Sequence, residues 1–231
     1  MSAADLMVVH DPKKFFAILF DLDGTLVDSA PDLAGAANEM RVSRGLEPLP
    51  YAALRPMVGS GARGMVGTAM QVRPEDPGFI SMRDEFLLRY EQRLTRETRL
   101  FAQMQEVLDA LGREGILWGI VTNKIARYAE PLVNALGLHT PSAVLVCGDT
   151  TAHAKPHPAP LIEAAKRINA NVKDCLYVGD DLRDVQAGKA AGMQTAAAAW
   201  GYLGKGEAVH DWGADHLLHE PPDLLKLLRL P

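Results

Sequence analysis

The feature that most constrains this chain is an apolar run of strand length, residues 15–20, which ends at two aspartates separated by one residue. In open α/β sheets, ligands bind at the carboxyl ends of the strands. Asp21 and Asp23 are therefore predicted to hold a ligand at the end of a buried strand, the alternative being that they only cap a turn. Gly24 and Thr25 follow, and Gly24 lets the backbone approach an anion closely.

Composition narrows the class of protein. The 231 residues permit one large domain or a core with an inserted unit. The formal net charge of −5, without a Lys/Arg stripe, argues against a nucleic-acid partner. No signal-like run and no apolar stretch of ~20 residues is present, which predicts a soluble, cytoplasmic protein without a membrane partner. Cys147 and Cys175 lie in apolar runs and are expected to be reduced core residues.

Strand-like apolar runs alternate with helical segments, which predicts an α/β fold with a parallel sheet and right-handed crossovers. The runs are apolar throughout, as expected for strands that are covered on both faces. Strands are expected at residues 16–20, 118–122, 143–147, 175–178 and 194–198. Helices are expected at residues 103–114, 126–136, 160–169, 184–191 and, near the C-terminal end, 222–228.

Residues 30–98 interrupt this alternation and are predicted to form an inserted helical cap. Roughly 70 residues separate the first strand from the next, which is too many for a single crossover. Helical stretches are expected near 32–44 and 79–96, whereas the glycine-rich residues 59–64 are expected to form a loop. The core would then comprise residues 1–29 and 99–231.

Two further polar clusters carry residues that suit phosphate chemistry. At the end of the second strand, the Thr122 hydroxyl can donate to a phosphoryl oxygen, and Asn123 can orient a nucleophile or bind substrate; N-capping is the alternative. Lys155 would place a positive charge among carboxylates and phosphate, unless it is a solvated lysine in a proline-rich loop. His157 has no second ligand at metal-binding spacing and is interpreted as a loop residue.

Three acids, Asp180, Asp181 and Asp184, crowd another strand-to-helix junction. Like charges at this spacing cost about 0.2–0.5 kcal/mol on a helix, which a protein surface tolerates. With Asp21 and Asp23 nearby the repulsion grows, so a bound cation becomes the natural explanation. Carboxylate oxygens suit Mg²⁺, which takes few carboxylates and completes its shell with water and substrate phosphate.

The four clusters together meet the demands of phosphate ester hydrolysis. The uncatalysed reaction is among the slowest known and needs acceleration of up to ~10²¹-fold, whereas general acid–base catalysis supplies about 10²–10⁴. A carboxylate nucleophile that forms an acyl phosphate, a second carboxyl group, a metal ion, a lysine and a hydroxyl donor would all contribute. The chain offers each of them near the end of an expected strand.

The ordered set of Asp21-Leu22-Asp23-Gly24-Thr25, Thr122-Asn123, Lys155-Pro156 and Gly179-Asp180 with Asp184 resembles the haloacid dehalogenase superfamily of aspartyl phosphatases. The resemblance runs from about residue 15 to the C-terminus. It implies a Rossmann-like core with a helical cap inserted between the first two motifs. It also implies Mg²⁺ as cofactor and a small phosphorylated metabolite as partner, while monomer and homodimer both stay open.

This resemblance also implies roles for the acidic residues. Asp21 would be the nucleophile and a Mg²⁺ ligand. Asp23 would be the general acid/base and would ligate Mg²⁺ through its backbone carbonyl. Asp180 would be a further Mg²⁺ ligand, and Asp184 would support the metal site from outside its ligand set.

The resemblance implies that the remaining motif residues bind the phosphoryl group, the nucleophile or the substrate. Thr122 would bind the phosphoryl group, and Lys155 would steady the nucleophile. Gly24, Thr25 and Asn123 are expected to contact the substrate.

Two groups within the superfamily share the motif details. The runs at 121–124, 155–158 and 179–184 look like those of phosphoglycolate phosphatases, and a Mg²⁺-dependent phosphomonoesterase of that type is the first hypothesis. Residues 61–63, 117–119 and 212–215, together with the run at 179–184, also look like N-acetylmuramic acid 6-phosphate phosphatases of cell-wall recycling, the alternative. Ile125 departs from the proline that is common to both groups, which alters the entry of the following helix and leaves the chemistry intact.

Two other functions are also compatible with parts of the pattern. A sugar-phosphate mutase of the same superfamily would share the core chemistry and differ in how its cap excludes water. A non-enzymatic phospho-acceptor switch resembling a receiver domain gathers similar residues, but the cap and the turn at 23–25 argue against it. Arg63, in the glycine-rich segment, is the candidate for binding the non-phosphate end of the substrate, or else a surface arginine.

Overall fold

The computed structural model describes residues 15–204 and 206–230 of the chain. Its centre is a six-stranded sheet in the order β5-β4-β1-β6-β7-β8, and every neighbouring pair of strands is parallel. The expected α/β class with a parallel sheet is thereby confirmed. The strands are β1 (Ala17–Phe20), β4 (Leu117–Val121), β5 (Leu145–Val146), β6 (Cys175–Gly179), β7 (Gln194–Ala198) and β8 (His216–Leu218).

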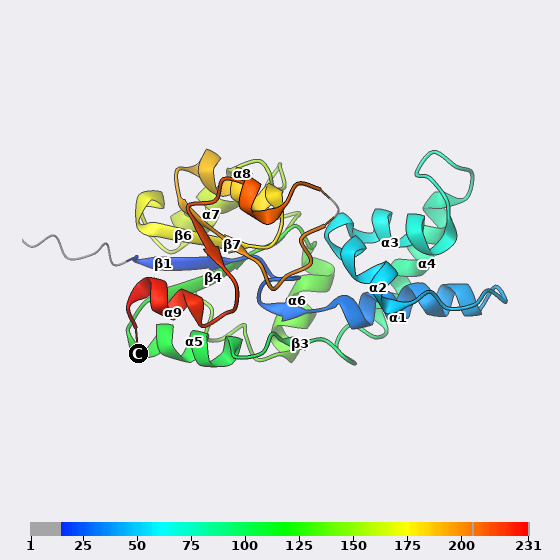
Figure 1. Ribbon diagram of the computed structural model, residues 1–231, viewed down its shortest axis with the longest axis horizontal. Coiled ribbons are helices and arrows are strands. Elements are labelled where there is room, and N and C mark those ends of the chain that lie inside the picture. Colours follow the sequence, from blue (N-terminus) through cyan, green and yellow to red (C-terminus); the bar gives the residue numbers. More distant parts are fainter. Residues whose placement is uncertain (1–14, 205, 231) are drawn as a thin grey trace, which may run out of the picture.

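Helices cover both faces of the sheet, which explains why its strands are apolar throughout. Figure 1 shows α5 (Met104–Arg113) and α9 (Asp223–Leu228) on one face, and α7 (Ala159–Arg167) and α8 (Leu182–Ala191) on the other. Side chains alternate along β1 between two cores. Ile18 packs in the cluster that contains residues of α5 and α9, and Leu19 in the cluster that contains residues of α7 and α8.

The sheet extends from β1 in two directions, toward β4 and β5 on one side and toward β6, β7 and β8 on the other, and this arrangement determines where the site lies. β1 lies between β4 and β6, although these three strands are far apart in the chain. The carboxyl ends of three neighbouring parallel strands therefore meet at one edge of the sheet, at a topological switch point, where open α/β folds bind ligands. The polar clusters after residues 20, 121 and 179 all lie at this edge.

The segment 30–98 is helical and lies beyond that edge (Figure 1). A short antiparallel pair, β2 (Val27–Asp28) with β3 (Arg99–Leu100), joins its entrance to its exit. Strands of two residues leave no sequence pattern, so the sequence did not predict them. The helices of this segment are α1 (Ala30–Val42), α2 (Tyr51–Leu54), α3 (Gly61–Met70) and α4 (Phe79–Glu91), with a 3₁₀ helix over Arg55–Ser60.

The prediction that residues 59–64 form a loop is wrong. Gly61 begins α3 with φ +61°, and Gly64 lies within this helix. A Cβ on Gly64 would lie 2.3 Å from the Ser60 Cβ and 3.2 Å from the Met57 carbonyl oxygen. Glycine is therefore needed here because α3 packs closely on the preceding 3₁₀ helix, and this contact outweighs the low helix propensity of glycine.

Other elements differ from expectation mainly at their ends. The expected helix 32–44 begins two residues earlier, at Ala30, and the expected helix 79–96 ends at Glu91. Cys147 and Cys175 are buried free thiols, as expected. Within the described ranges, no helix has both the length and the apolar character that a membrane span requires.

Candidate active site

Asp21 follows β1 and lies beside a buried lysine. Its side chain is 14% exposed, and its Oδ1 lies 2.8 Å from the Nζ of Lys155. This oxygen has no hydrogen bond of ordinary geometry to any described residue. Burial, which outweighs the opposing effect of Lys155, raises the pKa of Asp21 to about 6. Asp21 is thus held by an ion pair with Lys155 at the end of β1.

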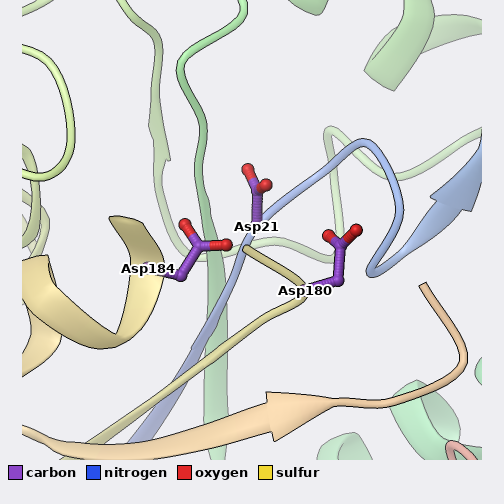
Figure 2. Close-up of side chains that lie close together, drawn as sticks. All are labelled: Asp21, Asp180 and Asp184. Atoms are coloured by element: carbon purple, nitrogen blue, oxygen red, sulfur yellow. The ribbon is translucent and has the colours of Figure 1, made fainter. Parts of the chain in front are cut away.

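Asp180 and Asp184 come from the end of β6 and the first turn of α8, and both face Asp21 (Figure 2). One carboxylate oxygen from each of the three residues lies within 4.8 Å of the others. Burial, together with the charges of Asp21 and Asp184, raises the pKa of Asp180 well above its ordinary value. Three carboxylates that repel one another in a buried place form the kind of oxygen site that a divalent cation occupies.

Neighbouring groups hold each of these carboxylates in place. Asp180 accepts hydrogen bonds from the Thr25 hydroxyl (2.9 Å) and the Tyr202 backbone N–H (2.8 Å). Asp184 accepts one from the Asp181 N–H (3.1 Å), as part of the capping box of α8. The acidic cluster is therefore preorganised, and rearrangement is not needed to form it.

Lys155 is the cation of this cluster. Its Nζ lies 2.8 Å from both Asp21 Oδ1 and Asp184 Oδ1, and it donates hydrogen bonds to the Tyr177 hydroxyl (2.7 Å) and the Val121 carbonyl (3.1 Å). Burial by itself lowers the pKa of this amine, but the two carboxylates outweigh burial and raise it. Lys155 is therefore a fixed positive charge, not the solvated loop lysine that the sequence left open. Tyr177 was predicted only as part of the strand at 175–178, since no local pattern indicates that its hydroxyl contacts Lys155.

Asp23 forms a second charged pair at the same edge. Both of its carboxylate oxygens lie 3.0 Å from Lys124 Nζ, and its Oδ1 also accepts a hydrogen bond from the Ser29 hydroxyl (2.5 Å). Burial acts against the charge of Lys124, but Asp23 raises the pKa of this amine above its usual range. Lys124 is part of a motif in the sequence but has no role there, because its contact with Asp23 spans a separation of 101 positions that no local pattern reveals.

Thr122 and Asn123 both lie beside this charged group. Thr122 is buried, and its hydroxyl accepts a hydrogen bond from the Lys124 N–H (3.1 Å). The Asn123 side-chain amide donates to the Lys155 carbonyl and accepts from the Lys155 N–H, both at 2.9 Å. Asn123 therefore positions the backbone of Lys155, and both residues line the cavity described below.

Gly24 and Thr25 both contact Asp180 of the acidic cluster. Gly24 has φ +89°, and a Cβ there would lie 2.2 Å from Asp180 Oδ2. Thr25 is fully buried and bonds Asp180. Neither residue belongs to the cavity wall, and their contact with a substrate stays a prediction.

A cavity of about 400 Å³ lies between the acidic edge of the sheet and the segment 30–98. Its floor carries charged residues from the core, whereas its roof is apolar and aromatic. The roof residues are Leu33, Val58, Phe86, Leu87 and Tyr90. The site thus combines charged groups at one end with a water-excluding wall at the other.

Two arginines lie differently from what the sequence alone suggested. Arg63 is not part of this wall: its side chain is 72% exposed and lies 4.0 Å from Glu75. The predicted contact of Arg63 with the substrate is not formed in this conformation and stays a prediction.

Arg183 lines the cavity together with Asp181, and its guanidinium contacts both Asp181 carboxylate oxygens, at 2.7 and 2.8 Å. Arg183 belongs to the run at 180–184, of which the sequence analysis interpreted only the three acidic residues.

His157 lies in an exposed loop, as interpreted, and its ring centroid is 4.4 Å from that of His153. The sequence interpretation overlooked this second histidine, which lies four residues earlier. Both rings are outside the cavity wall.

Comparison with known proteins agrees with this geometry. The chain is 42% identical over 212 residues to the N-acetylmuramic acid 6-phosphate phosphatase of Pseudomonas putida, covering 92% of this chain and 95% of that one. It is 45% identical over 209 residues to the phosphoglycolate phosphatase of Xanthomonas campestris, covering 90% and 94%. A solved structure from Haemophilus somnus, described as a predicted phosphoglycolate phosphatase, superposes with a TM-score of 0.81 at 28% identity, over 93% of this chain and 98% of that one.

The family model of haloacid dehalogenase-like hydrolases matches residues 18–198, which include all three acids of the cluster as well as Asp23 and Lys155. Because this match spans most of the chain and the curated relatives cover nearly all of it, the chain belongs to the haloacid dehalogenase-like hydrolases, an enzyme family.

Proposed function

We propose that this protein is a Mg²⁺-dependent phosphomonoesterase that works through an acyl phosphate on Asp21, the aspartyl-phosphate intermediate. One observation carries the proposal: the Asp21 carboxylate lies 2.8 Å from the Lys155 amine and within 4.8 Å of carboxylate oxygens of Asp180 and Asp184. A nucleophile beside a fixed cation and a cation-binding carboxylate group is the arrangement that phosphoryl transfer requires.

The residues present fit a magnesium ion. Asp21 and Asp180 would hold it together with the backbone carbonyl of Asp23, while Asp184, already bonded to Lys155 and the Asp181 N–H, would keep the cluster in place. When bound, Mg²⁺ neutralises phosphoryl charge and the mutual repulsion of the carboxylates. We propose the division into a core of residues 1–29 and 99–231 and a cap of residues 30–98 on the same basis, since the cavity is lined by both; residues 1–14, 205 and 231 lie outside the described residues.

The chain's own residues would then act in two steps. The Asp21 carboxylate attacks phosphorus, the bond from phosphorus to the ester oxygen breaks, and Asp23 gives its proton to the departing alkoxide. Asp23 next takes a proton from a water molecule, which attacks the phosphorus of the acyl phosphate and releases phosphate and Asp21. Lys155 and the Thr122 hydroxyl stabilise the charge on the phosphoryl oxygens throughout.

The names of the relatives suggest two substrates, whose charge and size can be compared with the residues and the volume of the cavity. Both compounds carry a carboxylate besides the phosphate, and in the described part of the wall Lys124, Lys155 and Arg183 each already face a carboxylate of the protein, so this charge does not distinguish between them. The apolar, aromatic roof and the 400 Å³ volume leave room for a larger leaving group. These observations favour N-acetylmuramic acid 6-phosphate, with phosphoglycolate as the other candidate.

The test compares Asp21→Asn with wild type in an assay of phosphate release from both compounds, with and without Mg²⁺. We expect turnover by the variant to fall at least about 10³-fold, because the covalent route is lost. Asp109→Asn, at an exposed position on α5, is the matched control and should keep full activity. Full activity in Asp21→Asn would refute the proposal, and isomerised product without free phosphate would indicate a mutase instead.

A further inference from the structure

The cap contributes a buried hydroxyl that the mechanism above does not use. Tyr90 of α4 is 2% exposed and lines the cavity, and its hydroxyl has no hydrogen-bond partner among residues 15–204 and 206–230. A buried hydroxyl without a partner is costly and rare in folded proteins, so each case calls for an explanation. A group that pairs only when a ligand enters the cavity provides one.

Tyr90 also belongs to an aromatic surface. Its ring stacks on Phe86, with centroids 6.5 Å apart and planes 8° apart, and meets Tyr128 at 6.0 Å. All three residues line the cavity. Aromatic faces pack favourably against the C–H face of a ring-shaped ligand, which a two-carbon ligand lacks.

A charge contact connects Tyr90 with the proposed acid. Lys124 Nζ lies 4.7 Å from the centroid of the Tyr90 ring and 3.0 Å from both Asp23 carboxylate oxygens. The part of a substrate that leaves with the proton of Asp23 therefore departs on the side where Tyr90 lies. Burial raises the pKa of Tyr90 to about 12, so its hydroxyl keeps its proton and can donate it in a hydrogen bond.

We infer that Tyr90 is a specificity-determining residue, whose hydroxyl bonds a polar oxygen of the leaving group while the ring of that group packs against Phe86 and Tyr128. The substrate class this predicts is a phosphate ester of a cyclic sugar, which carries hydroxyl or carbonyl oxygens on a ring with C–H faces. The inference rests on the proposed phosphomonoesterase function. A site built around such a bond discriminates strongly against ligands that lack the matching polar group.

The experiment compares Tyr90→Phe with the wild-type full chain and Mg²⁺, on glucosamine 6-phosphate, N-acetylmuramic acid 6-phosphate and phenyl phosphate. Phenyl phosphate offers a ring but no polar atom beyond the ester group. We expect kcat/KM for the better sugar phosphate to fall 10- to 100-fold, kcat/KM for phenyl phosphate to stay within twofold, and the melting temperature not to fall. Tyr51→Phe, on an exposed cap tyrosine outside the cavity wall, is the matched control for all three quantities.

Several results would overturn the inference. An equal effect on all substrates, or a lower melting temperature of Tyr90→Phe, would show that the hydroxyl has a structural partner such as a bound water. Wild type that hydrolyses phenyl phosphate but neither sugar phosphate would exclude the sugar class while keeping the phosphatase function. Wild type that releases phosphate from no ester with Mg²⁺ would instead defeat the proposed function, and the inference with it.

Discussion

Arg183, in the first turn of α8, donates a hydrogen bond to the backbone carbonyl of Gly59 in the cap, across 124 positions of the chain. The same guanidinium is held by the Asp181 carboxylate, which also caps the helix that carries Arg183. All three residues line the cavity. The loop after β6, which supplies Asp180, is therefore tied directly to the cap at the edge of the site.

Replacing Arg183 should weaken this tie. A hydrogen bond from a charged donor contributes about 1.5–3 kcal/mol, so we expect Arg183→Ala to lower kcat/KM about 10- to 100-fold if closure of the cap is required for turnover. Steady-state assays of phosphate release measure the effect. Arg83→Ala, which removes an exposed pair with Asp84 that is not part of the cavity wall, is the control. Equal kcat/KM in the two variants would mean that the contact with Gly59 has no functional consequence.

Gly24 and Gly45 offer a matched pair for testing the metal site. Both have positive φ, +89° and +71°, so alanine at either position introduces backbone strain of roughly 1–2 kcal/mol. Only at Gly24 does the new Cβ collide, at 2.2 Å, with Asp180 Oδ2; at Gly45 no atom lies within 4 Å. We expect Gly24→Ala to lose Mg²⁺ affinity at least 10-fold in calorimetric titrations, while Gly45→Ala retains it. Similar Mg²⁺ affinities would show that Asp180 is not a ligand.

The stability of the metal-free protein should depend on pH in a defined direction. The pKa of Asp21 is about 6 in the folded protein against an ordinary value of about 3.9, and the pKa of Asp180 is also raised. The folded state therefore binds more protons than the unfolded state, and stability falls as pH rises from about 4 through 6 and beyond. In thermal denaturation with EDTA, we expect a lower melting temperature at pH 8 than at pH 6.

Magnesium should reverse this trend, because it binds the ionised carboxylates. The gain in melting temperature on adding Mg²⁺ should therefore be larger at pH 8 than at pH 6. Asp180→Asn, which removes one of the repelling charges, should stabilise the metal-free protein at pH 8 and reduce the gain from Mg²⁺. A gain from Mg²⁺ that is independent of pH would contradict this account of the cluster.

Asp32 ties the entrance of the cap to its exit. Its side chain is fully buried and accepts hydrogen bonds from the Thr98 N–H (2.9 Å), the Thr98 hydroxyl (2.8 Å) and the Glu97 N–H (3.0 Å), and it pairs with Arg93. Removing one partner of a buried ion pair costs about 3–5 kcal/mol, and we expect this loss in the free energy of unfolding of Asp32→Ala.

Urea denaturation measures that loss. Asp84→Ala, which breaks an exposed pair with Arg83, is the control and should change stability by no more than about 0.5 kcal/mol. If Asp32→Ala were equally mild, the junction between core and cap would have to be held mainly by other contacts, such as the β2–β3 pair.

Several features of the site followed from the sequence because the relevant information is local. Each apolar run that ends in polar residues marks a strand end, and a parallel sheet brings those ends to one edge. This reasoning predicts from the sequence alone that Asp21, Thr122 and Asp180 lie near one another. It also predicted an insertion after β1, because 70 or so residues cannot form one crossover.

Local sequence patterns could not predict the contacts between segments that are distant in the chain. The pairing of Lys124 with Asp23 and the link from Arg183 to Gly59 depend on how the segment 30–98 and the loops pack, and so does the lack of a partner for the Tyr90 hydroxyl among the described residues. The helical state of residues 61–64 is a similar case, since tertiary packing outweighed glycine's weak propensity.

The sequence by itself thus determined the parallel sheet, the helical insertion after the first strand and which polar residues meet at the sheet edge, because strand periodicity and strand ends are encoded over a few neighbouring residues. Only the tertiary structure decided how those residues pair, that Arg63 is exposed and not part of the cavity wall, and that Tyr90 lines the cavity. Such contacts are set by side-chain packing between segments up to a hundred or more positions apart, and no local pattern records them.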